Sequence, residues 1–280
     1  MTRTRIPGSV ATVLLLGCAA YFVVPVWWLF TASTKSQGVL NLDSSPWFNQ
    51  FQLGDNVAAL LGRDDGIYLR WLVNSFLYSI VGATAGTVLA MMVGYAISKY
   101  RFRGRGVLFN LILAGVLVPP AALALPLFLM LSKVDLTNSY FAVLIPSMVS
   151  PLGVYLARVA VDAGVPDELV EAAAIDGAGG VRSLFRVAIP IIAPALVTIF
   201  LFQFVSIWNN FLLPLVMLNT KALYPVTLGL YNWSNAFIQD ATLISSVVVG
   251  SFLSIIPLVV GFILLQRYWT SGLAQGAMKG

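Results

Sequence analysis

Long apolar segments alternate with short polar segments along this chain. Each apolar segment is about as long as a helix that crosses a bilayer, which needs roughly 20 residues. The six segments span residues 10–30, 71–98, 107–131, 139–157, 187–218 and 241–266. This pattern predicts an all-α membrane protein, with one transmembrane domain of six helices across residues 1–280.

Prolines predict interruptions in two of these segments. Pro119, Pro120 and Pro126 lie within the third segment, where they should kink or break the helix. The fifth apolar region, Val187 to Thr220, has no charge over about 34 residues and is too long for one straight crossing. We expect its first part to lie along the membrane interface and its last part to re-enter, because it contains prolines at positions 190, 194 and 214.

The distribution of basic residues predicts the side of the membrane on which each polar segment lies. Lys99, Arg101, Arg103 and Arg105 have no acid nearby, and such clusters stay in the cytoplasm. If the chain crosses six times from a cytoplasmic N-terminus, eleven of the 16 Lys and Arg residues lie inside and five outside. Both termini are therefore predicted to be cytoplasmic, and residues 31–70 extracytoplasmic.

Composition excludes a soluble domain and narrows the chemistry. Hydrophobic residues make up 59% of the chain and charged residues 10%, and the mean hydropathy is +0.89. The chain has no His and one cysteine, Cys18, so metal or thiol chemistry is not indicated. An intramembrane hydrolase is poorly supported, because neither a His base nor an acidic pair lies at membrane depth. We predict a non-catalytic protein.

Two further absences narrow the function of such a membrane protein. Carriers coupled to protons or sodium use ionisable groups at membrane depth, and none lies near the centre of any apolar segment. The chain also lacks a GxxxxGK[ST] phosphate-binding loop. Active transport would therefore take its energy from a partner protein, and we expect no cofactor bound by this chain.

The polar segment 165–190 combines acidic residues with a Gly-rich turn. Asp167 and Glu168 follow Pro166, where the free N–H groups of a helix favour negative charge. Gly177 supplies a permissive stop after less than three turns. We expect a short, exposed, cytoplasmic helix. Helix physics alone fits a solvated connection equally well.

The order of residues in this loop resembles the EAA loop of permease subunits in ATP-binding cassette importers. Glu171-Ala172-Ala173 is followed after three residues by Gly177, and nine residues later come Val187, one residue, and Ile189-Pro190. The family has Ile and Leu where this chain has Val187 and Ile189, so the aliphatic character is kept.

Further matches, over roughly residues 10–280, resemble the smaller permease of maltose-type carbohydrate importers: Asn74-Ser75, Val118-Pro119-Pro120, Pro126-Leu127, Leu152-Gly153 to Arg158, Trp208-Asn209-Asn210-Phe211 and residues 271–280.

The resemblance implies a multi-pass protein of the cytoplasmic membrane with the type I importer permease fold. Its coupling residues would be Glu171, Ala172, Ala173, Asp176 and Gly177, on a helix that fits a cleft of an ATPase subunit. The cytoplasmic tail 268–280 would extend along the ATPase pair. Such permeases act as two non-identical subunits over two ATPase subunits, which bind the ATP and Mg, and an extracytoplasmic binding protein, expected to be a lipoprotein, delivers the substrate. The remaining contacts would be with membrane lipid, and no nucleic acid is expected.

Candidate residues for the substrate pathway come from the fifth apolar segment. Gln203, Asn209 and Asn210 carry uncharged hydrogen-bonding groups suited to sugar hydroxyls, and Trp208 can stack on a sugar face. The alternative is that these side chains bond across helices or to carbonyls freed by Pro214.

Taken with the resemblance, these features predict a permease for a carbohydrate, such as a di- or oligosaccharide. A permease for another small solute, such as a glycerophosphodiester or a polyol, shares the same motifs. A membrane scaffold protein without transport is the remaining alternative, and it would require the EAA pattern to be accidental.

Overall fold

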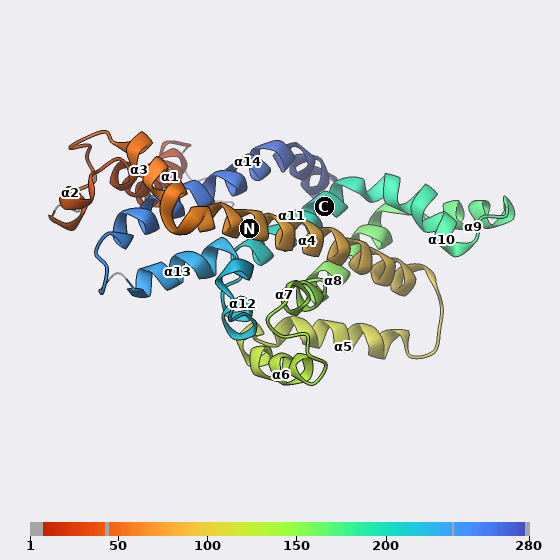
Figure 1. Cartoon of the computed structure of the whole chain (residues 1–280). Helices are drawn as coiled ribbons and strands as arrows, with labels where there is room; N and C mark the ends of the chain where they lie inside the picture. The colour runs from red at the N-terminus through yellow and green to blue at the C-terminus, as the bar shows by residue number, and fades with distance from the viewer. Residues whose placement is uncertain (1–7, 43–44, 237, 278–280) are drawn as a thin grey trace. The chain divides into compact units, whose positions relative to one another are not determined.

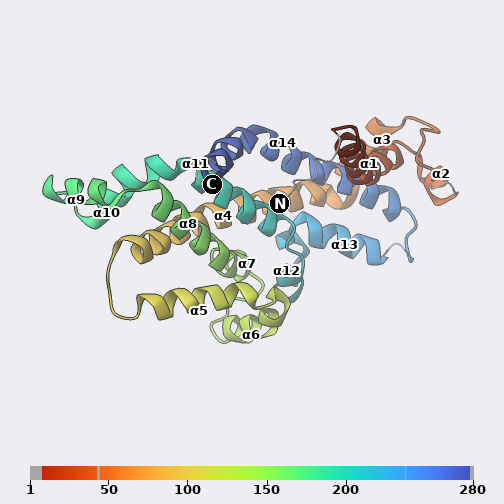
Figure 2. The same ribbon diagram turned by 180° about the vertical axis from the view of Figure 1, so that it is seen from behind.

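The computed structural model describes residues 8–42, 45–236 and 238–277 (Figure 1 and Figure 2). Within these ranges the chain forms helices joined by short connections, and no strand occurs. The chain divides into two compact units, Met1–Leu69 with Leu230–Pro257, and Arg70–Gly229 with Leu258–Gly280. The long helices α4 (Ile67–Lys99) and α14 (Leu243–Ala277) contribute residues to both units.

The first unit contains the polar segment that follows the first apolar helix. Its further elements are α1 (Gly8–Ser33), α2 (Gln37–Leu42), α3 (Leu53–Gly62), the 3-10 turn η1 (Arg63–Gly66) and the end of α13 (Val226–Ala236). Asn56 Nδ2 donates to the carbonyls of Ser33 (2.9 Å) and Lys35 (2.8 Å), which holds α3 against the end of α1. The Tyr68 hydroxyl donates to the Gly250 carbonyl at 2.7 Å, which joins the start of α4 to α14.

The second unit contains the polar loop 165–190. Its elements after α4 are α5 (Arg105–Leu117), α6 (Pro120–Ser132), α7 (Tyr140–Ser147), α8 (Pro151–Gly164), α9 (Asp167–Ile175), α10 (Gly180–Ser183), the π-helix η2 (Leu184–Ala188), α11 (Ile189–Trp208), α12 (Leu212–Met217), the 3-10 turn η3 (Lys221–Leu223) and the start of α13. The buried core beside the loop comprises Met91, Tyr95, Ala157, Val161, Val165, Leu184, Ala188, Ile192 and Ile199. This core joins α4, α8 and α11 around the two ends of the loop.

Among the residues that the structure describes, five stretches are long and apolar enough to cross a membrane: Ser9–Ser33, Leu53–Lys99, Tyr140–Gly164, Gly180–Trp208 and Leu243–Gln266. The pair α5 and α6 passes the same test together and is bent by 106° at the break between its helices, which makes a sixth. The break follows Val118, where Pro119 and Pro120 prevent continuation of α5. The expected interruption of the third segment is therefore confirmed.

Several helix boundaries differ from the apolar ranges read from the sequence. Helix α4 begins at Ile67 rather than near residue 71, because Asp64, Asp65 and Gly66 adopt positive φ and turn the chain just before it. The range 187–218 is divided, since α11 ends at Trp208 and α12 is a separate helix. Helix α14 continues beyond residue 266 to Ala277, so most of the predicted tail 268–280 is a continuation of this helix.

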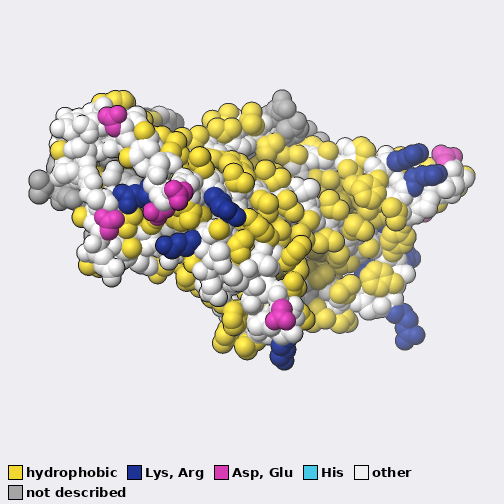
Figure 3. All heavy atoms as spheres, viewed as in Figure 1, with side chains coloured by type: hydrophobic (Ala, Val, Ile, Leu, Met, Phe, Trp, Pro, Cys, Tyr) yellow, Lys and Arg dark blue, Asp and Glu magenta, His cyan; other side chains and the backbone are white. Residues whose placement is uncertain are grey.

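The surface agrees with a chain whose helices face lipid or other subunits. Figure 3 shows hydrophobic side chains over much of the viewed face, while Lys, Arg, Asp and Glu side chains lie around α9 and α10 at the right of this view and also at its left and lower edge. Helix α1 is exposed along its apolar length, over residues 12–28. Such an exposed apolar helix fits a bilayer and not water.

Candidate functional site

Helix α9 forms the short exposed helix expected from the EAA pattern. It has nine residues, Asp167–Ile175, and it begins after Pro166 with two acids in its first turn. These acids complement the positive end of the helix dipole. Val170 packs against the buried core, whereas Ile175 is 87% exposed. One side of α9 is therefore attached to the protein and the rest is open.

The end of α9 is a Schellman motif built on a glycine. Ala178 N–H donates to the Ala173 carbonyl at 2.8 Å, and Gly177 N–H donates to the Ala174 carbonyl at 3.1 Å. Gly177 has φ of +77°, and nothing lies within 4 Å of the position that its Cβ would take. The glycine is therefore required for its backbone conformation and not for space.

The predicted coupling residues lie together at the open part of this helix. Glu171, Ala172 and Asp176 are exposed, and Ala173 is half-buried. Gly177 is exposed at the turn. The small Ala side chains leave the backbone of α9 accessible to a close neighbour.

A lysine at the end of α4 holds the beginning of α9. Lys99 Nζ donates to the Val165 carbonyl at 2.5 Å and to Asp167 Oδ1 at 2.6 Å. The Lys99 side chain is only 7% exposed, while that of Asp167 is 78% exposed. The hydrogen bond from Lys99, its positive charge, and the charge of Arg101 hold the pKa of Asp167 below its usual value. Sequence reasoning assigned Lys99 to the topology signal and missed this contact.

The same turn of α4 reaches two other elements. The Tyr95 hydroxyl donates to Ser183 Oγ at 3.1 Å, where α10 ends. Ser98 Oγ donates to Asp162 Oδ1 of α8, and Asp162 is also paired with Arg158 at 3.3 Å. A polar cluster thus joins α4, α8 and both ends of the loop.

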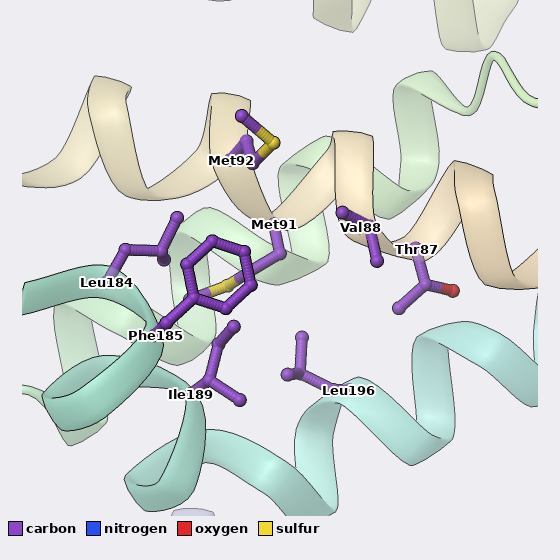
Figure 4. A pocket seen from close by; sticks show the side chains of 8 residues that line it. All are labelled: Thr87, Val88, Met91, Met92, Leu184, Phe185, Ile189 and Leu196. Carbon is purple, nitrogen blue, oxygen red and sulfur yellow. The ribbon is translucent and has the colours of Figure 1, made fainter. Parts of the chain in front are cut away.

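The chain returns to the membrane helices through the π-helix Leu184–Ala188. Such segments occur mostly as single turns within α-helices and frequently at functional sites. A small apolar crevice of about 40 Å³ separates it from α4 (Figure 4), lined by Thr87, Val88, Met91, Met92, Leu184, Phe185, Ile189 and Leu196. The side chains around the crevice are hydrophobic except for Thr87.

The candidate pathway residues of α11 lie in different environments. Gln203 is 7% exposed, its Oε1 accepts from Thr87 Oγ1 at 3.3 Å, and its Nε2 has no hydrogen-bond partner. Trp208 is 2% exposed and packs edge-on against Phe76, with ring centroids 5.0 Å apart. The buried indole therefore packs within this chain.

The two asparagines end α11 in different ways. Asn209 is exposed, and its Nδ2 donates to the Val205 carbonyl at 3.0 Å. Asn210 Oδ1 accepts from Leu213 N–H at 3.3 Å, which supports the first turn of α12. Of the four candidates, Asn209 has the most accessible side chain.

Comparison with known proteins places this chain among transport proteins. Residues 86–274 match the family described as binding-protein-dependent transport system inner membrane component. The arabinooligosaccharides transport system permease protein AraQ of Halalkalibacterium halodurans is 36% identical over 215 residues, which cover 77% of this chain and 76% of that protein. AraQ of Bacillus subtilis is 30% identical over 274 residues, which cover 96% of this chain and 95% of that protein.

A solved structure has the same fold. It is the crystal structure of a bacterial ABC transporter involved in the import of the acidic polysaccharide alginate, in which one chain matches with a TM-score of 0.81 and 24% identity. The match covers 96% of this chain and 98% of that chain. The family match and the two AraQ proteins, together with this fold, establish that the chain belongs to the binding-protein-dependent transport system inner membrane components, the permease subunits of ATP-binding cassette importers.

Proposed function

We propose that this permease moves a carbohydrate, such as a di- or oligosaccharide, across the cytoplasmic membrane, and that α9 is the helix through which partner ATPase subunits drive it. Support for the substrate class comes from the relatives, whose names refer to arabinooligosaccharides, lactose, trehalose and galactooligosaccharides. Neutral hydrogen-bonding groups suit such substrates, and Asn209 offers one in an exposed position.

The observation that carries the coupling role is the construction of α9. The helix is attached to the core through Val170 and through the contacts at its start, while Glu171, Ala172 and Asp176 are exposed. An attached helix with an open acidic and small-residue surface is suited to docking in a cleft of another protein. A merely solvated connection would not need the core contact or the Lys99 bonds.

The proposal includes the arrangement of subunits. The chain pairs with a second, non-identical permease over two ATPase subunits that bind ATP and Mg, and an extracytoplasmic binding protein delivers the substrate. Helix α9, the basic residues 99–105 and both termini lie on the cytoplasmic side. Closure of the ATPases on ATP would move the two coupling helices together and open the pathway outward, and hydrolysis would reset it.

A second substrate class has specific support. Two relatives are named for a sulfoquinovosyl glycerol transport system and for uptake of osmoprotective compounds, at 28% and 31% identity. The first name refers to a glycerol-containing solute and the second to osmoprotective compounds, so a glycerol-containing solute or a polyol is the second candidate. Competition of uptake by sugars and by polyols separates the two classes.

The test uses two substitutions in the loop, Glu171→Lys and Gly177→Asp. The first reverses a charge on the exposed surface of α9, and the second places a side chain at φ of +77°. Both variants should reach the membrane and pair with the partner permease, yet lose the ATPase subunits or lose uptake while ATP is still hydrolysed. The measurements are uptake, membrane abundance and ATPase copurification.

Gly179→Asp is the matched control. Gly179 lies in the same loop and nothing lies within 4 Å of its Cβ position, but it has an ordinary φ of −65° and precedes α10 as its N-cap. Asp is favoured at such a position, so this variant should transport normally. Normal uptake in Glu171→Lys and Gly177→Asp as well would mean that α9 is only a solvated connection.

A further inference from the structure

One turn of α4 makes polar contacts with the residues before and after the exposed part of the loop. Tyr95 and Lys99 are four residues apart on α4, so they share one face of the helix. Lys99 bonds to Val165 and Asp167, where α9 begins. Tyr95 bonds to Ser183, where α10 ends. Helix α9 and the Gly177 turn lie between these two attachments.

The helix dipole of α9 does not explain the position of Lys99. A positive charge at the N-terminus of a helix opposes the helix dipole. The lysine is nevertheless almost fully buried there, and both of its bonds hold the two residues on either side of Pro166. Because the two charge-assisted bonds hold both sides of Pro166, they fix the direction in which the chain enters α9 as well as its distance from α4.

Near its N-terminal end, α4 is hydrogen-bonded to the connection that leads into α13. Asn74 Nδ2 donates to the carbonyls of Ala222 (2.9 Å) and Tyr224 (3.0 Å), and Ser75 Oγ accepts from Val226 N–H at 2.8 Å, where α13 begins. Helix α4 runs without interruption from Ile67 to Lys99 over 33 residues, about 50 Å at 1.5 Å per residue. One continuous helix therefore joins the start of α9 to the start of α13.

We propose that Lys99 is a positioning residue that makes α9 and α4 move together, so that displacement of α9 reaches the residues 222–226 at the far end of α4. This inference rests on the proposed coupling function. Lys99 fixes the direction in which α9 leaves α8, Asp167 neutralises its charge, and the Tyr95 bond fixes the return of the loop.

The experiment uses the complete importer, reconstituted with its ATPases and binding protein, with Lys99→Met as the main variant. Met keeps the length and apolar stem of the side chain and removes both hydrogen bonds. Assembly and ATP hydrolysis should stay within about twofold of the wild type. Substrate moved per ATP hydrolysed should fall about tenfold, the loss expected if the coupled arrangement depends on the free energy of one hydrogen bond to a charged group. Lys99→Arg keeps the charge and should restore part of this ratio.

Arg103→Met is the matched control, because it removes a charge from the same basic run at an exposed residue. It should leave the ratio unchanged. Asp167→Asn is the second variant and does not depend on the folding of Lys99→Met, since the Asp167 side chain is 78% exposed. It should lower the ratio in the same direction, and an unchanged ratio in Asp167→Asn or in Lys99→Met would overturn the inference.

A spin label at Ile175, which is 87% exposed, and one at Met92, which is 43% exposed, separate transmission from simple loss of structure. In the wild type both labels should respond to ATP. In Lys99→Met the Ile175 label should still respond while the Met92 label should not. A Met92 response equal to that of the wild type would contradict the inference.

If Glu171→Lys and Gly177→Asp also transport normally, the proposed function itself fails. If they abolish transport while Lys99→Met does not change the ratio, only the role of Lys99 is lost.

Discussion

Gly86 of α4 lies directly against the side-chain amide of Gln203 of α11. A Cβ atom at Gly86 would lie 2.6 Å from Gln203 Oε1, 2.8 Å from its Nε2 and 2.9 Å from the Met148 carbonyl oxygen. The absent side chain lets the two helices approach, and the Thr87 hydroxyl beside it donates to Gln203 Oε1. Small residues at such contacts are typical of helix packing in membranes.

Gly86→Ala should therefore destabilise the chain. Adding a methyl group to a filled contact costs about 1–3 kcal/mol, and part of the contact here is backbone that cannot rotate away. The thermal midpoint of the purified protein in detergent should fall. Gly261→Ala is the control, since this glycine is inside α14 with nothing within 4 Å of its Cβ position, and its midpoint should stay or rise. Equal thermal midpoints for Gly86→Ala and the wild type would show that the neighbouring groups can accommodate the methyl group without loss of stability.

Asn209→Leu and Asn210→Leu should have different effects. Asn210 supports the start of α12 through its bond to Leu213 N–H, so its replacement removes a hydrogen bond from the first turn of this helix and should lower stability by about 0.5–1.5 kcal/mol. Asn209 bonds only within its own helix and is exposed. If it contacts substrate, Asn209→Leu should slow uptake and leave assembly and basal ATP hydrolysis unchanged. Loss of the complex in Asn209→Leu would mean that its role is structural.

The apolar helices and the EAA loop could be predicted because their signals are local. Charge-free runs long enough to cross a membrane, the prolines at 119 and 120 and the Gly177 stop each act on their own neighbourhood. The prolines predicted a break but not its angle of 106°, because the angle is set by the packing of α5 and α6 against other helices. Nothing in the sequence indicated the π-helix at 184–188.

The contacts that position the site could not be predicted in this way. Lys99 and Asp167 are 68 residues apart, and a basic residue at the end of an apolar run indicates topology equally well. Trp208 and Asn209 are adjacent and were considered together as pathway candidates, yet the first is buried and the second exposed. Successive residues of a helix point about 100° apart, so neighbours in sequence enter different environments.

Labelling of single cysteines tests the orientation of the chain. In a background without Cys18, Arg103→Cys should be protected from an impermeant thiol reagent added outside the cell, whereas Asp55→Cys should react. Asp55 lies on α3 and is exposed, and it avoids the positive φ of Asp64 and Asp65. Permeabilised cells provide the control, in which both cysteines should react. Equal labelling in intact cells would overturn the predicted six-span topology.

The contact between Lys99 and Asp167 should depend on pH only in the acid range. The pKa of Asp167 is lowered, first by the hydrogen bond from Lys99 and then by the charges of Lys99 and Arg101. A carboxyl group with a lowered pKa stabilises the folded state fully above its unfolded pKa, about 3.9, and loses this contribution as the pH falls through the folded value. The attachment of α9 should therefore be constant from about pH 7 to pH 5 and weaken below about pH 4.

A spin label at Ile175 in the purified chain provides the measurement, because this residue is exposed near the end of α9. Its mobility should stay constant down to about pH 5 and rise below about pH 4, in the range where Asp167 takes up its proton. In Asp167→Asn the mobility should already be higher at neutral pH and should show no further rise in the acid range, since the group that titrates is absent. An acid-induced rise of the same size in Asp167→Asn would assign the effect to other carboxyl groups and would remove Asp167 as its cause.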